Sequence, residues 1–490
     1  MIRTLRLLLS APLLLAATSC ALGEGEDEVD VVFIGDPDKL QQNGVRLTPA
    51  AQHVREATAE GLVTFDAAGN VVPAIAERWI VTDDGLSYIF RLRDSQWANG
   101  SPLTAQSVKQ EMDRTLARLE GTSLGLDVDI IADVRAMAGR VVEIQLEHPM
   151  AEFLQLLGQP ELGLMRNNRG LGPMVAEESD GQVVLTALPP EQRGLPAFED
   201  WDETVRPVIL RAYPAEDAIA AFESGEADAV LNGRIQNLLL ADVGPLSRGT
   251  IRLDSVTGLL GLKVRRARGF LGQSYEREAL AMAIDRGKLF ESLNLGQWQQ
   301  TTRIVPQLDL ASETPQPQRW SGMTVEQRQT EAARRVAGWI GRGGADRTVR
   351  IALPAGPGSD RAFESLQEDI GAIGLQLVRV AQTQEADLVL VDSVARYTDE
   401  RWFLNQLNCR VSQTLCSREA DLAVIAALRE DDPAERARLL AEAETILLDL
   451  NGYIPLGAPV RWSLVRGGVD GFEANRTGFH PLFPLALRPI

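Results

Sequence analysis

Hydrophobic and polar positions follow two different periods that alternate along the whole chain. Residues 29–35 (VDVVFIG) form a short β-branched run, which predicts a buried strand ending at Gly35. Residues 277–293 carry apolar side chains three and four positions apart, the spacing of one amphipathic helix. Because extended and helical patterns alternate throughout, we expect an α/β fold with mixed sheets rather than a helix bundle or a β-sandwich.

Turn and cap signals separate these elements. An Asp-Asp-Gly sequence at residues 83–85 lies between the alternating stretches IVT and SYIFRLR, which predicts a β-hairpin. Thr104 precedes a helical pattern and is expected to cap that helix at its N-terminus. Residues 434–450 predict another long helix near the end of the chain.

Length, charge and composition narrow the function classes. The 490 residues exceed one ordinary core and suggest two or three domains or lobes. A net charge of −19 argues against a protein that binds the phosphate backbone of nucleic acid, because that role needs a basic surface. The chain has three His and three Cys, and the His residues are isolated in the sequence, so we expect no metal site and no cofactor.

The first twenty residues have the layout of a secretory signal. Arg3 and Arg6 precede an apolar run from Leu7 to Ala17, and small residues then lead to Cys20. This run is too short to cross the roughly 30 Å hydrocarbon layer as a stable helix. The rest of the chain has no run of 18 apolar residues, so we expect a protein that works outside the cytoplasm and spans no membrane.

The end of this segment resembles the bacterial lipobox, in which a Cys after small residues becomes the lipidated first residue of the mature chain. The resemblance implies a signal peptide over residues 1–19, lipidation of Cys20, and a lipid-attached tether over residues 20–28. Ala17 departs from the Leu that is usual in this motif. The expected location is the periplasm or cell envelope, with the protein anchored to a membrane; an ordinary cleaved signal is the alternative.

Residues 60–108 carry many anchors of one protein family. They include Pro-Ala-x-Ala-Glu-x-Trp, Asp-Asp-Gly-Leu-x-Tyr-x-Phe and a closing Pro-Leu-Thr-Ala. The segment is similar to the extracytoplasmic solute-binding proteins of ABC importers, in the family of dipeptide, oligopeptide and nickel binders (family 5). Weaker matches follow in the expected order at Gly172-Pro173 and at residues 213–228, 276–288 and 453–460.

The resemblance implies a two-lobed, type II periplasmic-binding-protein-like fold that closes on a ligand in the cleft between its lobes. Lobe 1 would cover residues 29–262 with an inserted subdomain at about 46–170, and lobe 2 would cover residues 263–458. Residues 459–490 would return to lobe 1.

The implied function is binding of a peptide or peptide-like solute and its delivery to an ABC permease in the membrane, by a monomer. We expect no enzyme, since the sequence has no His-Glu-x-x-His zinc motif and no Walker loop. A protein that keeps the binding fold but has left transport, and acts as a sensor or envelope scaffold, is the alternative.

Candidate ligand residues lie in a loop of the expected second lobe. Peptide binders of this family often carry an Asp in a Tyr-Pro-Asp-Pro-like loop, where it pairs with the peptide amine. Tyr397-Thr398-Asp399 matches Tyr-x-Asp, although Thr398 and Glu400 replace both prolines. The resemblance implies Asp399 as the amine-binding carboxylate, with Tyr397 and Trp402 as pocket walls. Solvated loop charges are the alternative.

Cys409 and Cys416 are close enough in sequence to form a disulfide in an oxidising compartment. Such a bond would stabilise the fold by roughly 2–3 kcal/mol in the chain-entropy model. Because these residues follow the candidate ligand loop, the bond would stiffen a pocket wall. Two unpaired, small apolar side chains are the alternative.

Overall fold

The computed structural model describes residues 28–42, 44–241, 250–306, 317–412 and 415–488. The expected signal peptide, Cys20 and nearly all of the expected tether lie outside these residues. Among the described residues, no helix is long and apolar enough to cross a membrane.

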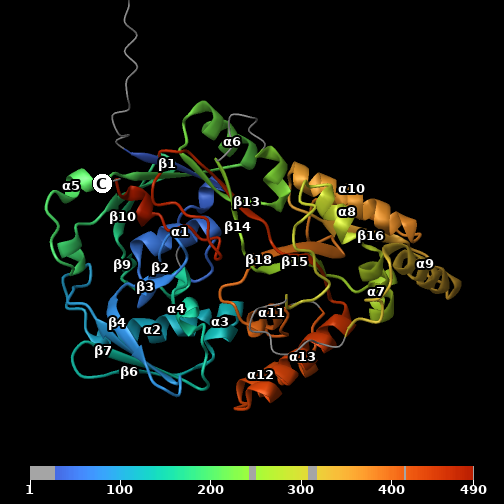
Figure 1. The fold of residues 1–490 in the computed structure, drawn as a ribbon, viewed down its shortest axis with the longest axis horizontal. Helices are drawn as coiled ribbons and strands as arrows, with labels where there is room; N and C mark the ends of the chain where they lie inside the picture. The colour runs from blue at the N-terminus through green and yellow to red at the C-terminus, as the bar shows by residue number, and fades with distance from the viewer. Residues whose placement is uncertain (1–27, 43, 242–249, 307–316, 413–414, 489–490) are drawn as a thin grey trace, which may run out of the picture.

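The largest sheet has seven strands, of which β1, β10, β13 and β14 are labelled in Figure 1. Its central strand β1 pairs in parallel with β12 and β13, and the other pairs in this sheet are antiparallel. β1 ends one residue before Gly35, as the sequence predicts. In spatial order the strands are β10 (Met174–Ser179), β11 (Gln182–Ala187), β12 (Val208–Tyr213), β1 (Val29–Ile34), β13 (Ala229–Arg234), β20 (Arg461–Val465) and β14 (Ile251–Asp254).

A second, five-stranded sheet is also mixed. β16 pairs in parallel with β17 and β18, whereas β15 pairs antiparallel with β18 and β19. The two mixed sheets confirm the predicted α/β class. In spatial order the strands are β17 (Gln376–Arg379), β16 (Thr348–Ala352), β18 (Leu388–Val394), β15 (Gly258–Val264) and β19 (Tyr453–Gly457).

A four-stranded antiparallel sheet contains the hairpin predicted around residues 83–85. Gly85 takes a positive φ of 69° at this turn, a conformation that glycine adopts without steric cost. The strands, in order, are β4 (Ala76–Val81), β5 (Ser87–Leu92), β7 (Val141–Leu146) and β6 (Ile131–Ala136). Two short hairpins complete the strands, β2 (Val63–Phe65) with β3 (Val71–Pro73), and β8 (Met165–Arg166) with β9 (Arg169–Gly170).

The helices cover the sheets and follow most of the sequence signals. The hydroxyl group of Thr104 accepts from Ser107 N at 3.1 Å, which caps α2 as expected. The helices are α1 (Pro49–Thr58), α2 (Ala105–Leu119), α3 (Ser123–Val128), α4 (Phe153–Leu157), α5 (Trp201–Thr204), α6 (Ala215–Ser224), α7 (Ser274–Ala283), α8 (Arg286–Glu291), α9 (Val325–Gly341), α10 (Pro357–Ala372), α11 (Glu400–Asn405), α12 (Arg418–Leu428) and α13 (Pro433–Leu450).

One helix prediction is wrong. Residues 277–293 do not form a single helix, because α7 ends at Ala283 and α8 begins at Arg286. Asp285 adopts an extended backbone, and its side chain accepts a hydrogen bond from Lys288 N at 3.2 Å. An Asp that caps a new helix competes with continuation of the old one, and the apolar spacing does not reveal this.

Two short connections join the large sheets. Only residues 255–257 separate β14 from β15, and only residues 458–460 separate β19 from β20. The chain therefore passes from the seven-stranded sheet to the five-stranded sheet and returns beside its starting point. The lobe boundaries that the sequence analysis places after residues 262 and 458 stay a proposal. The connections at residues 255–257 and 458–460 lie close to these boundaries.

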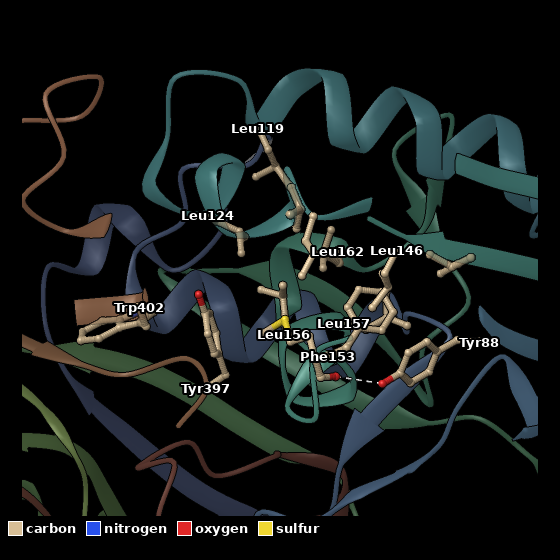
Figure 2. Packing of buried hydrophobic residues seen from close by; sticks show 14 of the residues in the cluster. Tyr88, Leu119, Leu124, Leu146, Phe153, Leu156, Leu157, Leu162, Tyr397 and Trp402 are labelled. Atoms are coloured by element: carbon tan, nitrogen blue, oxygen red, sulfur yellow. Dashed lines mark hydrogen bonds between the residues drawn. The ribbon is translucent and has the colours of Figure 1, made fainter. Parts of the chain in front are cut away.

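The segment from 397 to 407 packs on the part of the chain that carries the four-stranded sheet. Tyr397 and Trp402 belong to one buried hydrophobic cluster with Leu124 and Leu156. Figure 2 shows these side chains together. Within the same region, a hydrogen bond from Tyr397 to Asp127 spans 270 positions in the sequence. The apolar core therefore connects segments that are far apart along the chain.

Candidate ligand-binding site

A cavity of about 420 Å³ lies where the two large sheets meet. The seven-stranded sheet contributes Phe33 from β1, Arg461 from β20, and Leu231, Asn232 and Arg234 from β13. The five-stranded sheet contributes residues 392–394 from β18. A space enclosed by strands of both sheets, beside the short connections between them, has the location expected of a ligand cleft.

An ion pair joins the two sheets at this cavity. Arg461 Nη1 on β20 lies 2.7 Å from Asp392 Oδ1 on β18, and both side chains are 8% exposed. Arg461 also donates to the carbonyl oxygen of Val460, at 2.8 Å. Because the pair is nearly shielded from water, removal of either partner would leave a buried charge without compensation.

Arg234 is held at the end of β13 by its neighbours. Its backbone N–H donates to Asn237 Oδ1 at 2.8 Å, and its carbonyl oxygen accepts from Trp462 Nε1 at 3.0 Å. A Cβ on Gly233 would lie 2.1 Å from Trp462 Cδ2, so only glycine permits this approach of the strand to the indole. The backbone that carries Arg234 is thereby fixed at the cavity wall.

The Arg234 guanidinium has neutral partners. Nε donates to Asn232 Oδ1 at 3.2 Å, and Nη1 donates to the carbonyl oxygen of Asp392 at 3.4 Å. Burial lowers the pKa of Arg234, and the positive charge of Arg461 lowers it further, against the effect of Asp392. The group is a cation at the cavity whose contacts are polar but uncharged.

Arg396 ties the loop after β18 to the opposite wall. Its Nη1 donates to Ser123 Oγ at 3.2 Å, and its Nη2 lies 4.0 Å from Glu161 Oε1. The carbonyl oxygen of Arg396 accepts from Gln159 Nε2 at 3.1 Å. Ser123, Gln159 and Arg396 all line the cavity.

The fold brings together two histidines that are far apart in the sequence. His480 N donates to His53 Nε2 at 3.5 Å across 427 positions, and both residues line the cavity. His53 Nδ1 donates to the carbonyl oxygen of Pro49 at 2.7 Å. Because Nε2 accepts from His480 N, this imidazole is neutral with its proton on Nδ1. Burial lowers the pKa of His53 to about 4, with a smaller contribution from the charge of His480.

The histidines are isolated in the sequence, so no local signal could have revealed the contact between His53 and His480. His480 Nε2 lies 3.0 Å from Asp254 Oδ2. In the described part of the chain, no group of three or more His, Cys, Asp and Glu could hold a metal ion.

Of the three residues expected to contact the ligand, the structure places one at the cavity. Trp402 lines the cavity, but Asp399 and Tyr397 are not among the lining residues. The Asp399 carboxylate accepts from Arg401 N at 2.8 Å and caps α11. Its role as an amine-binding carboxylate stays a prediction, and Asp392 is the carboxylate that the structure places at the cavity.

Tyr397 is fully buried between the loop and α3. Its hydroxyl group donates to Asp127 Oδ1 at 2.9 Å, and Asn405 Nδ2 donates to the same oxygen at 2.8 Å. Burial raises the pKa of Asp127 to about 6, although Arg401 and these hydrogen bonds favour the ionised form. This buried cluster fixes the loop that continues from the cavity wall.

Cys409 and Cys416 are joined by a disulfide in the structure. The bond follows α11, and Cys409 N also donates to Asp421 Oδ2 at 3.1 Å. It closes a small loop between α11 and α12 rather than the cavity wall itself, since neither Cys is among the lining residues.

Comparison with known proteins agrees with this geometry. The family model of the "Bacterial extracellular solute-binding proteins, family 5 Middle" matches residues 70–410. The "Probable di/tripeptide-binding protein 5" of Pseudomonas aeruginosa (strain UCBPP-PA14) is 24% identical, covering 98% of this chain and 98% of its own. The "Glutathione-binding protein GsiB" of Salmonella typhimurium is 24% identical, covering 88% of this chain and 87% of its own.

A solved structure establishes the fold. Haemophilus influenzae OppA in complex with RPPGFSPFR superposes with a TM-score of 0.77 at 18% identity, covering 95% of this chain and 99% of OppA. This likeness confirms the type II periplasmic-binding-protein-like architecture with mixed sheets. The family and the fold are those of extracytoplasmic solute-binding proteins rather than of enzymes. The chain belongs to family 5 of the bacterial extracellular solute-binding proteins.

Proposed function

We propose that this protein binds a peptide or peptide-like solute outside the cytoplasm and delivers it, unaltered, to an ABC importer. The observation that carries the proposal is the cavity of about 420 Å³ enclosed by both large sheets. This volume lies within the usual range of small-ligand sites. Relatives named as di/tripeptide-binding and glutathione-binding proteins, and a peptide complex of OppA, support a peptide as the solute.

The proposed mechanism is closure of two lobes around the solute. The connections at residues 255–257 and 458–460 are short, and hinges of this kind need only a few residues that absorb a change in φ and ψ. The ion pair between Asp392 and Arg461 spans the two sheets beside the second connection. A solute that contacts both sheets favours the closed form by its higher affinity for that form, and the permease would recognise the closed form.

The proposal includes the place where the protein works. A lipid on Cys20 would hold the monomer at a membrane of the cell envelope through the acidic tether at residues 20–28. Mass spectrometry of protein from the native host tests the anchor. Acylation of Cys20 supports it, and a mature chain that lacks a lipid would exclude it.

A thermal-shift screen with di- and tripeptides tests the binding function. A peptide at 100 times its dissociation constant should stabilise the protein by about 2.7 kcal/mol, because it binds only the folded state. The bound peptide should be recovered intact after denaturation. Cleaved peptide would contradict delivery without turnover, and the absence of any stabilising peptide would contradict the proposed solute.

A genetic test separates transport from the alternative of sensing or scaffolding. Deletion of the gene should abolish uptake of the bound peptide from the medium. Peptide that binds in vitro but enters the deletion strain at an unchanged rate would favour the alternative.

A further inference from the structure

The residues that line the cavity carry a net positive charge, whereas the whole chain carries a net negative charge. Three guanidinium groups line it, those of Arg234, Arg396 and Arg461, whereas Asp392 is the only carboxylate among the lining residues that the structure describes. The chain as a whole carries a net charge of −19. The basic lining is therefore a local feature of the cavity and does not follow from the composition.

The single carboxylate is already neutralised. Asp392 pairs with Arg461 at 2.7 Å within a nearly buried contact. The positive charge of Arg396 is partly compensated, because its Nη2 lies 4.0 Å from Glu161 Oε1. The same oxygen also accepts a hydrogen bond from Gln52 Nε2 at 2.8 Å. A solute that enters the cavity thus meets an excess of positive charge.

Among the described residues, Arg234 is the arginine of the cavity that forms no ion pair. It makes no ion pair with any carboxylate in the described residues, and its hydrogen-bond partners there are an amide oxygen and a carbonyl oxygen. A half-buried guanidinium with neutral partners is costly to the unliganded protein. A ligand carboxylate would supply both the missing charge and a bidentate acceptor.

We propose that the solute is acidic and that one of its carboxylates pairs with Arg234. This inference rests on the proposed function and narrows its solute class to peptides with an acidic side chain or to related small dicarboxylates. Both sources present the same carboxylate to the cavity. The packing of Gly233 against Trp462 fixes the backbone at Arg234. The preference for an acidic solute therefore comes from a residue whose backbone is held in the cavity wall.

Isothermal titration calorimetry with a matched panel tests the inference. The panel contains Ala-Glu-Ala, Ala-Gln-Ala and Ala-Lys-Ala, together with the free dicarboxylates succinate and glutarate. We expect Ala-Glu-Ala to bind at least about tenfold tighter than its isosteric Gln peptide, and Ala-Lys-Ala to bind more weakly than both. Equal affinities for the Glu and Gln peptides, or tighter binding of the Lys peptide, would overturn the inference.

Two variants assign the preference to Arg234. Arg234→Gln should remove the difference between the Glu and Gln peptides, mainly by weakening the binding of the Glu peptide. Arg234→Lys should retain part of the difference, because it keeps the charge but loses the bidentate geometry. Arg438→Gln on the exposed surface of α13 removes the same charge from a residue that does not line the cavity, and it should change neither affinity. A Glu preference that survives Arg234→Gln would overturn the assignment.

The melting temperature of the unliganded variant excludes a folding defect. Because Arg234 makes no ion pair with a carboxylate in the described part of the chain, Arg234→Gln should melt at the same temperature as the wild type or higher, while the stabilisation by acidic ligands is lost. Failure of the inference differs from failure of the proposed function. If the dicarboxylates bind through Arg234 but no peptide binds, the acidic preference stands and the peptide function fails. If no acidic member of the panel binds, the inference fails.

Discussion

The hydroxyl group of Tyr397 donates a hydrogen bond to Oδ1 of Asp127, at 2.9 Å, and so joins the loop after β18 to α3. The two residues are separated by 270 positions in the sequence, and both are almost fully buried. The contact lies in the apolar core shown in Figure 2, where Tyr397 and Leu124 are labelled. It fixes the segment that begins at Arg396 in the cavity wall.

Removal of this hydroxyl group should destabilise the protein modestly. Tyr397→Phe leaves Asn405 as a donor to Asp127, so the expected loss in the free energy of unfolding is about 1–2 kcal/mol. Asp127→Ala should cost more, since it leaves both donors buried without an acceptor. Urea denaturation measures both variants. Equal stability of Asp127→Ala and the wild type would show that the cluster does not hold the loop.

His53 should make stability depend on pH below neutrality. Its folded pKa of about 4 lies below the ordinary value of 6.5, so the unfolded chain takes up a proton that the folded chain refuses. The contribution of His53 to the free energy of unfolding is nearly constant above pH 6.5. It becomes increasingly unfavourable to the folded state as the pH falls towards 4. At pH 5 the expected loss is about 2 kcal/mol.

The variant His53→Gln isolates this effect. The difference in unfolding free energy between wild type and variant should shift by about 2 kcal/mol in favour of the variant between pH 7 and pH 5. A difference that does not change with pH would show that the pKa of His53 is the same in the folded and the unfolded protein.

The disulfide between Cys409 and Cys416 should be detectable by mass. Alkylation without reductant should leave both residues unmodified, and alkylation after reduction should modify both. The double variant Cys409→Ser, Cys416→Ser should lose roughly 2–3 kcal/mol of stability. Alkylation of both residues in the untreated protein would mean that the bond does not form.

Gly233→Ala tests the close approach of β13 to Trp462. The added Cβ would overlap the indole ring, so we expect a loss of about 1–3 kcal/mol in the free energy of unfolding. Ligand affinity should fall as well, because Arg234 follows directly. Gly467→Ala is the matched control, since its Cβ would meet no atom within 4 Å. Equal stability of the two variants would contradict the close packing.

Local signals in the sequence predicted the local structure well. The hairpin at residues 83–85 and the cap at Thr104 depend on residues within a few positions of each other, and both appear as expected. The helix over residues 277–293 failed for a local reason, since the cap at Asp285 overrides the apolar spacing. Local patterns therefore predict which helices and strands form, but they do not predict every residue at which an element ends.

The cavity could not be assembled from the sequence, because its walls depend on contacts between distant residues. Arg461 meets Asp392 across 69 positions, and His480 meets His53 across 427 positions. The resemblance to Tyr-x-Asp led to Asp399, which caps α11, whereas Asp392 and Arg396, a few residues earlier, line the cavity. A motif identified the segment, and strand pairing decided which side chains line the cavity.

A crystal structure of the protein with the tightest peptide of the panel tests the central claim most directly. The claim predicts the intact peptide between the two large sheets, in contact with residues from both β13 and β18. A peptide bound on one sheet alone or outside this cavity, or a cavity filled by side chains in the complex, would contradict it.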